Sequence, residues 1–180
     1  LPVRVRSVLL SADQANAAVR RGLTQLWGCE IFEHYGMTEM GLGGAVDCPA
    51  HAGYHVRESE LLVEVIDPVS GKPVAPGTAG EVVFSTLNRR GMPLIRYRTG
   101  DLSRLLPGVC ACGSVLTRLE RIIGRVDGGL SLADAGELTI GALDEVIFAF
   151  EDIADFEAIV EPGTPPVLNI VLSVTGDARS

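Results

Sequence analysis

The first 35 residues of this chain have the pattern of a strand, a helix and a second strand. Residues 3–10 are β-branched and apolar enough for a buried strand, and apolar residues then recur at helical spacing over residues 15–27. Asp13 can cap this helix and Gly28 can end it. Because residues 30–35 form a second strand pattern, the sequence predicts a βαβ unit, and ligands of such units bind beyond the strand ends.

The sequence pattern changes from residue 54 onward, where short strand patterns alternate with turn-forming residues. The segment 67–73 (DPVSGKP) is typical of a hairpin loop, and residues 75–77 (APG) of a second turn. The expected strands are 61–66, 81–87, 94–98 and 102–105. This part is therefore predicted to form a small, distorted antiparallel β-barrel subdomain beside the parallel unit.

A third pattern follows Gly124. Residues 140–150 have helical character, and strands are expected over residues 156–161 and 167–174. The predicted fold class is therefore α/β, with the start of a small α+β carboxy-terminal domain. The domain boundaries are placed at residues 1–123 for the larger part, 124–128 for a hinge, and 129–180 for the smaller part.

Composition excludes several classes of partner. The chain has 180 residues, 47% of them hydrophobic, so it can bury a core. Its net charge of −8 argues against nucleic acid or an anionic membrane as a partner. Neither a run of about 18 apolar residues nor a secretory leader pattern occurs, so a cytoplasmic location is expected. Because Leu1 leads straight into a strand pattern, the chain is interpreted as the later part of something longer.

Three segments place an acidic residue beside a glycine: 35–39 (YGMTE), 98–101 (RTGD) and 124–127 (GRVD). Glycine lets backbone amides approach phosphate closely, and a carboxylate can hold a metal ion or the hydroxyls of a ribose. One such segment is as readily a surface turn with a solvated acid, or a turn aspartate that bonds its own backbone. The three together, in this order, indicate ATP.

These segments carry a family resemblance. With residues 80–87 (GEVVFSTL), 89–101 (RRGMPLIRYRTGD) and 34–40 (HYGMTEM), the chain resembles the adenylate-forming superfamily of acyl-CoA synthetases, luciferases and peptide-synthetase adenylation domains. Within that superfamily it is most similar to the phenylacetate-coenzyme A ligase group. The resemblance implies an ATP-dependent acid-thiol ligase that forms acyl-AMP from a small, possibly aryl, carboxylic acid and then passes the acyl group to coenzyme A.

The same resemblance implies that this chain alone is inactive. The glycine-rich phosphate loop of the amino-terminal part is not present, and Lys72, the only lysine, lies in a hairpin loop instead of at the carboxy-terminal position that contacts the carboxylate. The missing amino-terminal part is therefore expected as a partner of the same enzyme.

Residue roles also follow from the resemblance. Thr38 and Glu39 are expected to be catalytic, with Glu39 holding magnesium, and Asp101 to clamp the ribose. Arg125 is expected at the ribose or phosphate, in a hinge about which the carboxy-terminal domain rotates between an adenylation pose and a thioester-forming pose. Gly128 replaces the family's second acid here. The expected nucleotide-binding residues are Tyr35, Gly36, Met37, Thr38, Asp101 and Arg125.

Arg98 has two interpretations of equal weight. Its guanidinium can pair with a phosphate of the nucleotide or with another carboxylate of the protein. The sequence alone does not separate these two interpretations.

The cysteines and histidines suggest a separate metal site. Cys110 and Cys112 form a C-x-C loop, and residues 48–55 (CPAHAGYH) offer one more thiol and two imidazoles. Tetrahedral zinc with thiolate and histidine ligands fits this set, and three thiolates with one histidine leave no open position, so the zinc is expected to be structural. The predicted ligands are Cys48, His55, Cys110 and Cys112.

Alternatives remain at this point. His51 can replace His55 as a ligand, and the thiols can also be unconnected, while Cys29 is most simply a core thiol. A different class of function is a non-catalytic, zinc-stabilised domain with vestigial nucleotide contacts that serves in assembly. A rubredoxin-like electron carrier would need four cysteines around iron, and the distance of Cys29 from the others disfavours it.

Overall fold

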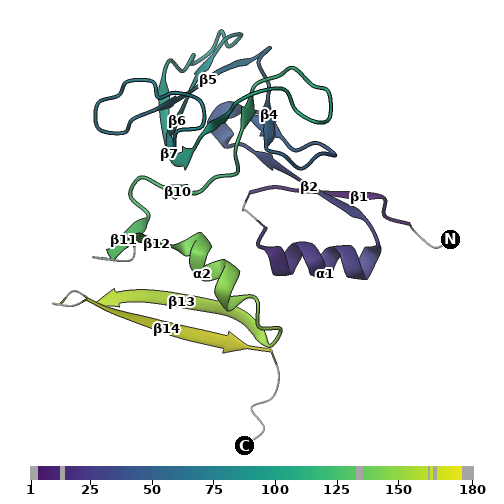
Figure 1. The fold of residues 1–180 in the computed structure, drawn as a ribbon, viewed down its shortest axis with the longest axis vertical. Coiled ribbons are helices and arrows are strands. Elements are labelled where there is room, and N and C mark those ends of the chain that lie inside the picture. The colour runs from purple at the N-terminus through teal and green to yellow at the C-terminus, as the bar shows by residue number, and fades with distance from the viewer. Residues whose placement is uncertain (1–3, 13–14, 133–135, 162, 164–165, 176–180) are drawn as a thin grey trace, which may run out of the picture.

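The computed structural model describes residues 4–12, 15–132, 136–161, 163 and 166–175. Within these ranges the chain is a mixed α/β protein with several sheets and few helices. The sheet-rich part lies at the top of Figure 1, and the carboxy-terminal part lies below it. No helix in the described ranges reaches the length and apolar character needed to cross a membrane.

The predicted βαβ unit is present. Strand β1 (Ser7–Leu10) pairs in parallel with β2 (Glu30–Tyr35), and helix α1 (Ala17–Trp27) connects them. The side chain of Asn16 caps α1 by accepting from the Val19 amide, and Gly28 ends the helix with a left-handed φ of 59°. Asp13, the expected cap, lies outside the described residues.

The expectation that the first strand is buried was wrong for the described chain. Strand β1 has no buried residue, and Leu9 is 57% exposed. The physical reason is its position: β1 is the edge strand of its sheet, paired only with β2. Apolar composition predicts that a strand is stable when buried, but it does not show which helix or strand would cover it.

Short antiparallel strands extend this sheet beyond β2. Tyr35 pairs with Ala45 of β3, Val46 pairs with His55 of β4, and Tyr54 pairs with Leu119 of β9. The full order is β1-β2-β3-β4-β9-β8, where the added strands are β3 (Ala45–Val46), β4 (Tyr54–Val56), β8 (Leu105–Leu106) and β9 (Arg118–Leu119). The sheet thus runs from the parallel unit to the segment that carries the C-x-C loop.

A second sheet has the order β10-β7-β6-β5 and supplies a large share of the core. Its strands are β5 (Leu61–Ile66), β6 (Gly80–Thr86), β7 (Tyr97–Ser103) and β10 (Gly124–Arg125). Phe84 on β6 is fully buried and packs in one cluster with Leu61 and Met40, the last residue of a short 3-10 helix (Thr38–Met40). The core therefore fixes the segment that follows β2.

The structure corrects the strands predicted around the RTGD motif. Two separate strands were expected, over 94–98 and 102–105, with the motif as a turn between them. Instead β7 runs through the motif without interruption, and a register shift occurs opposite it, between Glu81 and Val83. Gly100 absorbs the irregularity with a φ of +76°, which a residue with a side chain rarely adopts.

The carboxy-terminal part is built from two hairpins and a helix. A hairpin of β11 (Gly129–Leu132) and β12 (Gly136–Thr139), which the sequence patterns did not predict, follows β10. It leads into α2 (Ile140–Ile147), capped by Thr139, whose side chain accepts from the Ala142 amide. Strands β13 (Ile153–Glu161) and β14 (Val167–Val174) then pair antiparallel at the bottom of Figure 1, close to the predicted limits.

Candidate functional site

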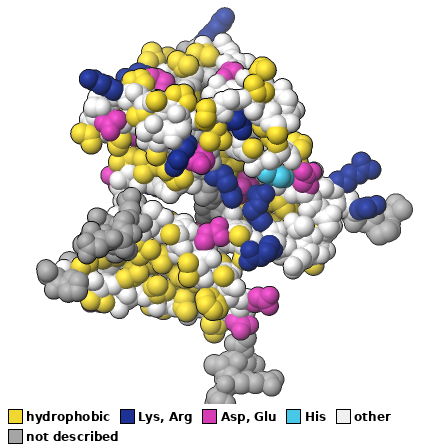
Figure 2. Space-filling model, in the orientation of Figure 1, with side chains coloured by type: hydrophobic (Ala, Val, Ile, Leu, Met, Phe, Trp, Pro, Cys, Tyr) yellow, Lys and Arg dark blue, Asp and Glu magenta, His cyan; other side chains and the backbone are white. Residues whose placement is uncertain are grey.

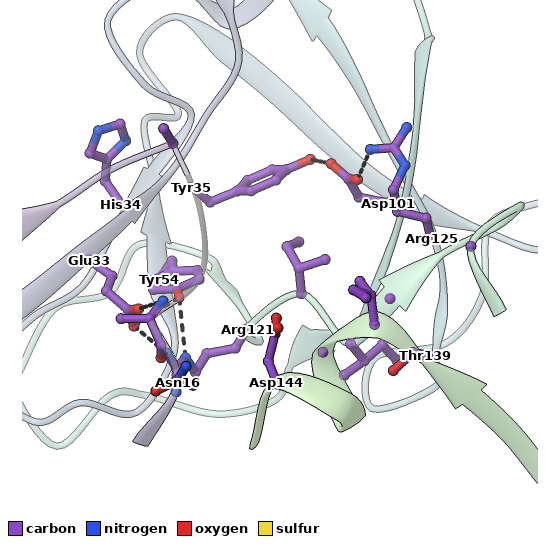
Figure 3. Close-up of a pocket in the computed structure, with 18 of the residues that line it drawn as sticks. Asn16, Glu33, His34, Tyr35, Tyr54, Asp101, Arg121, Arg125, Thr139 and Asp144 are labelled. Atoms are coloured by element: carbon purple, nitrogen blue, oxygen red, sulfur yellow. Dashed lines mark hydrogen bonds and ion pairs between the residues drawn. The ribbon is translucent and has the colours of Figure 1, made fainter. Parts of the chain in front are cut away.

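A cavity of about 420 Å³ lies between the sheet-rich part and the carboxy-terminal part. The end of β2 and the turn after it form one wall, and β7 and β10 contribute a second. The third wall comes from Thr139 and the first residues of α2. Figure 3 shows side chains from these separate segments around the same space. Five of the six expected nucleotide-binding residues line it: Tyr35, Gly36, Met37, Asp101 and Arg125.

Asp101 is held between two of these residues. The Tyr35 hydroxyl donates to Asp101 Oδ2 at 2.8 Å, and Arg125 Nη1 lies 2.5 Å from Asp101 Oδ1 (Figure 3). Strand pairing explains the second contact, because Arg125 of β10 stands directly opposite Asp101 of β7. Asp101 is only 7% exposed, whereas the Arg125 side chain is 62% exposed. The arginine can therefore leave toward solvent or a ligand more easily than the aspartate can.

The electrostatics keep Tyr35 protonated as a donor. Burial raises the pKa of Tyr35 well above its usual range, and the neighbouring Asp101 carboxylate raises it further. Both carboxylate oxygens of Asp101 thus face hydrogen-bond donors inside the protein. A pair of vicinal hydroxyls can take over these donor positions, which is the chemistry needed to bind a ribose.

A buried carboxylate forms the floor of the cavity. Glu33, 4% exposed, accepts from Arg121 Nη2 at 2.6 Å, and Arg20 lies 2.8 Å away. It also accepts the Ala15 amide at 2.9 Å and the Tyr54 hydroxyl at 3.4 Å. Burial alone would lower the pKa of Arg121, but the contacts with Tyr54 and Glu33 raise it. This network joins α1, β2, β4 and the segment between β9 and β10.

The turn after β2 requires glycine. A Cβ on Gly36 would lie 2.8 Å from Gly43 Cα, a backbone atom that cannot rotate away. Thr38 is exposed and Glu39 is half-buried in the short 3-10 helix, and within the described ranges neither lines the cavity. The structure therefore brings Tyr35, Asp101 and Arg125 together, while the other two predicted residues lie further along the same turn.

Arg98 pairs with a carboxylate of the protein. Its Nε donates to Glu81 Oε2 at 2.8 Å, and Glu81 is 3% exposed. The other oxygen of Glu81 accepts the Gly100 amide at 3.1 Å. Of the two interpretations left open by the sequence, the structure thus shows the ion pair, which fixes the backbone just before Asp101.

The four predicted metal ligands converge on one point. The ligand atoms of Cys48, His55, Cys110 and Cys112 all lie within 4.8 Å of one another. Cys48 Sγ is 3.7 Å from Cys110 Sγ, and Cys112 Sγ is 3.3 Å from His55 Nε2. Zinc-sulfur bonds of about 2.3 Å in a tetrahedron give sulfur-sulfur distances of about 3.8 Å. The cluster thus already has the dimensions of a zinc site.

His51, the alternative ligand, points elsewhere. Its Nδ1 lies 2.6 Å from Asp47 Oδ2, and its ring packs against Phe32 in a tilted arrangement. The other oxygen of Asp47 accepts the Cys48 amide at 2.8 Å. His51 therefore supports the loop that carries Cys48 through Asp47, while His55 Nε2 faces the thiols.

The local field favours a thiolate in the cluster. A hydrogen bond from the Cys112 amide lowers the pKa of Cys110 to about 6, and contacts with Cys112, His55 and Cys48 contribute. Burial raises the pKa of Cys48. The surroundings of Cys110 therefore favour its thiolate, the form in which cysteine binds metal.

Several cavity residues were not predicted from the sequence, namely Asn16, Glu33, Tyr54, Arg121 and the start of α2. Glu33 offered a usable signal, because it shares a strand face with Ile31 and Tyr35, and a carboxylate on such a face needs a cationic partner. The α2 residues offered none, since their place depends on how the carboxy-terminal part packs against the sheets.

Comparisons with known proteins agree on one group. A family model described as AMP-binding enzyme matches residues 1–88. The chain is 32% identical over 161 residues to the phenylacetate-coenzyme A ligase of Thermus thermophilus. This alignment covers 85% of the present chain and 36% of that enzyme. The chain is 34% identical over 152 residues to the phenylacetate-coenzyme A ligase of Escherichia coli, covering 83% and 34%. The chain thus spans about a third of the length of these curated relatives.

Solved structures show the same fold. The crystal structure of 2-hydroxyisobutyryl-CoA ligase in the postadenylation state aligns with a TM-score of 0.80 and 19% identity over 93% of this chain and 37% of that one. The same ligase in the thioesterification state, also 19% identical, aligns over 93% of this chain and 36% of that one with a TM-score of 0.63. The fold of the present chain is therefore found within this ligase, and the fit depends on the state of that protein.

Proposed function

Because this chain belongs to the adenylate-forming superfamily, in its phenylacetate-coenzyme A ligase-like group, we propose that it is the later part of an ATP-dependent acid-CoA ligase. The observation that carries the proposal is the convergence of Tyr35, Asp101 and Arg125 on one cavity (Figure 3). These residues come from three separate segments, and their chemistry suits the ribose and phosphates of a nucleotide.

In the proposed reaction the nucleotide binds in this cavity. A carboxylate oxygen of the acid attacks the α-phosphorus of ATP, pyrophosphate leaves, and the acid becomes an acyl-AMP. The thiol of coenzyme A then attacks the acyl carbonyl, and AMP leaves. Asp101 holds the ribose throughout, while Tyr35 lies where it can contact the adenine. Basic side chains gather around the junction of the two parts in Figure 2, which suits the anionic ligand.

Thr38 and Glu39 are proposed to act on the phosphates. Magnesium binds through one or two carboxylates together with phosphate oxygens, so a single acid in the turn is a sufficient protein ligand. Glu39 is half-buried in the turn that begins at Gly36, next to the cavity wall. Thr38 would donate its hydroxyl to a phosphate oxygen. Bound magnesium would neutralise charge as pyrophosphate leaves.

The finer organisation is also part of the proposal. Residues 1–123 form the later portion of a large domain whose antiparallel strands make a distorted barrel, residues 124–128 act as the hinge, and residues 129–180 begin a small α+β domain. The proposed hinge begins with the two residues of β10, contains Gly128 and ends directly before β11. The acid is proposed to be small and possibly aryl, and the amino-terminal part of the same enzyme completes the site.

We further propose that the four-residue cluster of Cys48, His55, Cys110 and Cys112 binds one structural zinc ion. The thiols lie in two loops, and His55 lies on β4, so the metal would join the loop after β3 to the loop between β8 and β9. Cys48, His55 and Cys110 are all buried, with exposures of 8% or less. Three thiolates and one imidazole would complete the tetrahedron, which fits a structural role.

The four cysteines are free in the structure. Unpaired thiols persist in a reducing compartment, so we propose a cytoplasmic location.

Nucleotide binding by this chain itself tests the proposed cavity. We expect AMP to bind more tightly than 2′,3′-dideoxy-AMP, by about tenfold or more, because the analogue lacks both hydroxyls that Asp101 would accept. Isothermal titration calorimetry measures both affinities under one set of conditions. Equal affinities, or no saturable binding of AMP, would contradict the assignment of Asp101 as the ribose ligand.

A further inference from the structure

The first turn of α1 receives a carboxylate from the other part of the molecule. The amide of Ala17 donates to both carboxylate oxygens of Glu145, each at 3.2 Å. Glu145 lies on α2, 128 positions further along the chain. In Figure 1 the two helices lie beside one another, α1 below β1 and β2, and α2 above β13 and β14. This contact therefore joins the carboxy-terminal part to the parallel unit across the cavity.

Both physical terms of this contact are favourable. The first amides of a helix have no partner within the helix, and Glu145 supplies one to Ala17. The amino-terminal end of a helix also carries a partial positive charge that attracts a carboxylate. Asn16, the cap residue, accepts the Val19 amide, so the two side chains satisfy different donors of the same turn.

The backbone at the start of α1, where Glu145 binds, is held in place by further hydrogen bonds. The Ala15 amide donates to Glu33 at 2.9 Å, and the Ala15 carbonyl accepts from Arg121 Nη2 at 3.1 Å. The backbone immediately before α1 is thus tied to the floor of the cavity. Glu145 itself lines the cavity together with Ile140 and Gly141. A contact that holds α2 in place therefore also holds the third wall of the cavity.

We propose that Glu145 is a positioning residue that holds the carboxy-terminal part closed over the nucleotide cavity, in the arrangement used for acyl-AMP formation. The proposal rests on the ligase function given above. The better fit of this chain to the postadenylation state than to the thioesterification state of 2-hydroxyisobutyryl-CoA ligase supports it. Rotation about residues 124–128 into the other pose would separate Glu145 from Ala17.

The test uses this chain and three variants, Glu145→Ala, Glu145→Gln and the control Glu151→Ala. Glu151 is exposed just beyond α2, and its substitution by alanine changes the net charge by the same amount as Glu145→Ala. Residual dipolar couplings measured by NMR report whether the two parts share one orientation, and the Ala17 amide resonance reports the contact directly. Couplings within each part show whether that part remains folded, so loss of structure is separated from loss of orientation.

We expect one common alignment for the unchanged chain and for Glu151→Ala. In Glu145→Ala the two parts should need separate alignments, and the Ala17 resonance should shift. Glu145→Gln keeps a hydrogen-bond acceptor but loses the charge. The alignment and the Ala17 shift of this variant should therefore lie between those of the unchanged chain and of Glu145→Ala. A single alignment with an unshifted Ala17 resonance in Glu145→Ala would overturn the proposal, as would a Gln variant that behaves like the Ala variant.

AMP affinity separates this proposal from the proposed function. If the cavity binds AMP, Glu145→Ala should weaken binding by about two- to fivefold, the size expected for one charge at a helix terminus. An unchanged AMP affinity in that variant would count against the positioning role. If the unchanged chain binds no AMP, the nucleotide function fails, while the NMR result still decides whether Glu145 joins the two parts.

Discussion

Substitution of Cys112 by serine is expected to remove zinc from this chain and to lower its melting temperature by roughly 10 °C. Structural zinc supplies about 10–16 kcal/mol to small zinc-finger peptides. Even a third of that amount corresponds to a fall of this size in a domain of this length. Elemental analysis of protein purified without chelator, together with calorimetry, measures both quantities.

The exposure of Cys112 makes this substitution diagnostic. Cys112 is exposed, unlike the other three members of the cluster, so replacing it in a metal-free protein would change stability by only about 0.5 kcal/mol. A large loss of stability therefore has to come through the metal. Cys29 lies outside the cluster, and Cys29→Ala should retain the full zinc content. Purified protein without zinc, or a Cys112→Ser variant of unchanged melting temperature, would refute the zinc proposal.

Substitution of Asp101 by alanine is expected to weaken AMP and ATP binding by about 10- to 100-fold in an enzyme that contains this chain. Each hydrogen bond from a ribose hydroxyl to a carboxylate contributes about 1.5–3 kcal/mol when the group is desolvated. Asp101 is nearly buried and already placed between two donors, so little reorganisation is required. Equilibrium titration with each nucleotide measures the loss.

Asp67→Ala is the matched control for this experiment. Asp67 carries the same charge, but its carboxylate caps a hairpin loop by accepting the Ser70 amide at 2.6 Å, outside the cavity lining. Its removal should leave nucleotide affinity unchanged. Equal affinity in wild type and Asp101→Ala would show that the ribose lies elsewhere.

Local sequence patterns predicted most elements where they were strong. The limits of β2, β5 and β14 agree with the apolar and β-branched runs over residues 30–35, 61–66 and 167–174. These runs carry their own signal, because strand residues alternate or cluster between turn residues. The C-x-C spacing likewise brought Cys110 and Cys112 to attention, and their partners were the nearest remaining thiol and imidazole.

Features set by long-range pairing were not predictable. Nothing local to Gly100 shows that β7 continues through the motif, since the extra residues of the motif are accommodated by an irregular pairing with β6. The contact of Arg125 with Asp101 depends on the register between β10 and β7. The contact of Glu145 with Ala17 depends on the orientation of a whole domain. In each case the stabilising contact is made by a residue distant in the sequence. The periodicity of apolar residues along the chain carries no information about such contacts.

Acid-dependent exchange of pyrophosphate into ATP tests the central claim most directly. The assay compares this chain alone with the chain joined to an amino-terminal part that carries the glycine-rich phosphate loop and to a carboxy-terminal segment that carries the lysine. Positioning of several groups around one ATP can supply roughly 7–11 kcal/mol of a barrier. We therefore predict exchange with a small carboxylic acid only in the extended protein, and its loss in Glu39→Ala. Robust exchange by the 180-residue chain alone, or an extended, folded, AMP-binding protein that exchanges with no acid, would contradict the account.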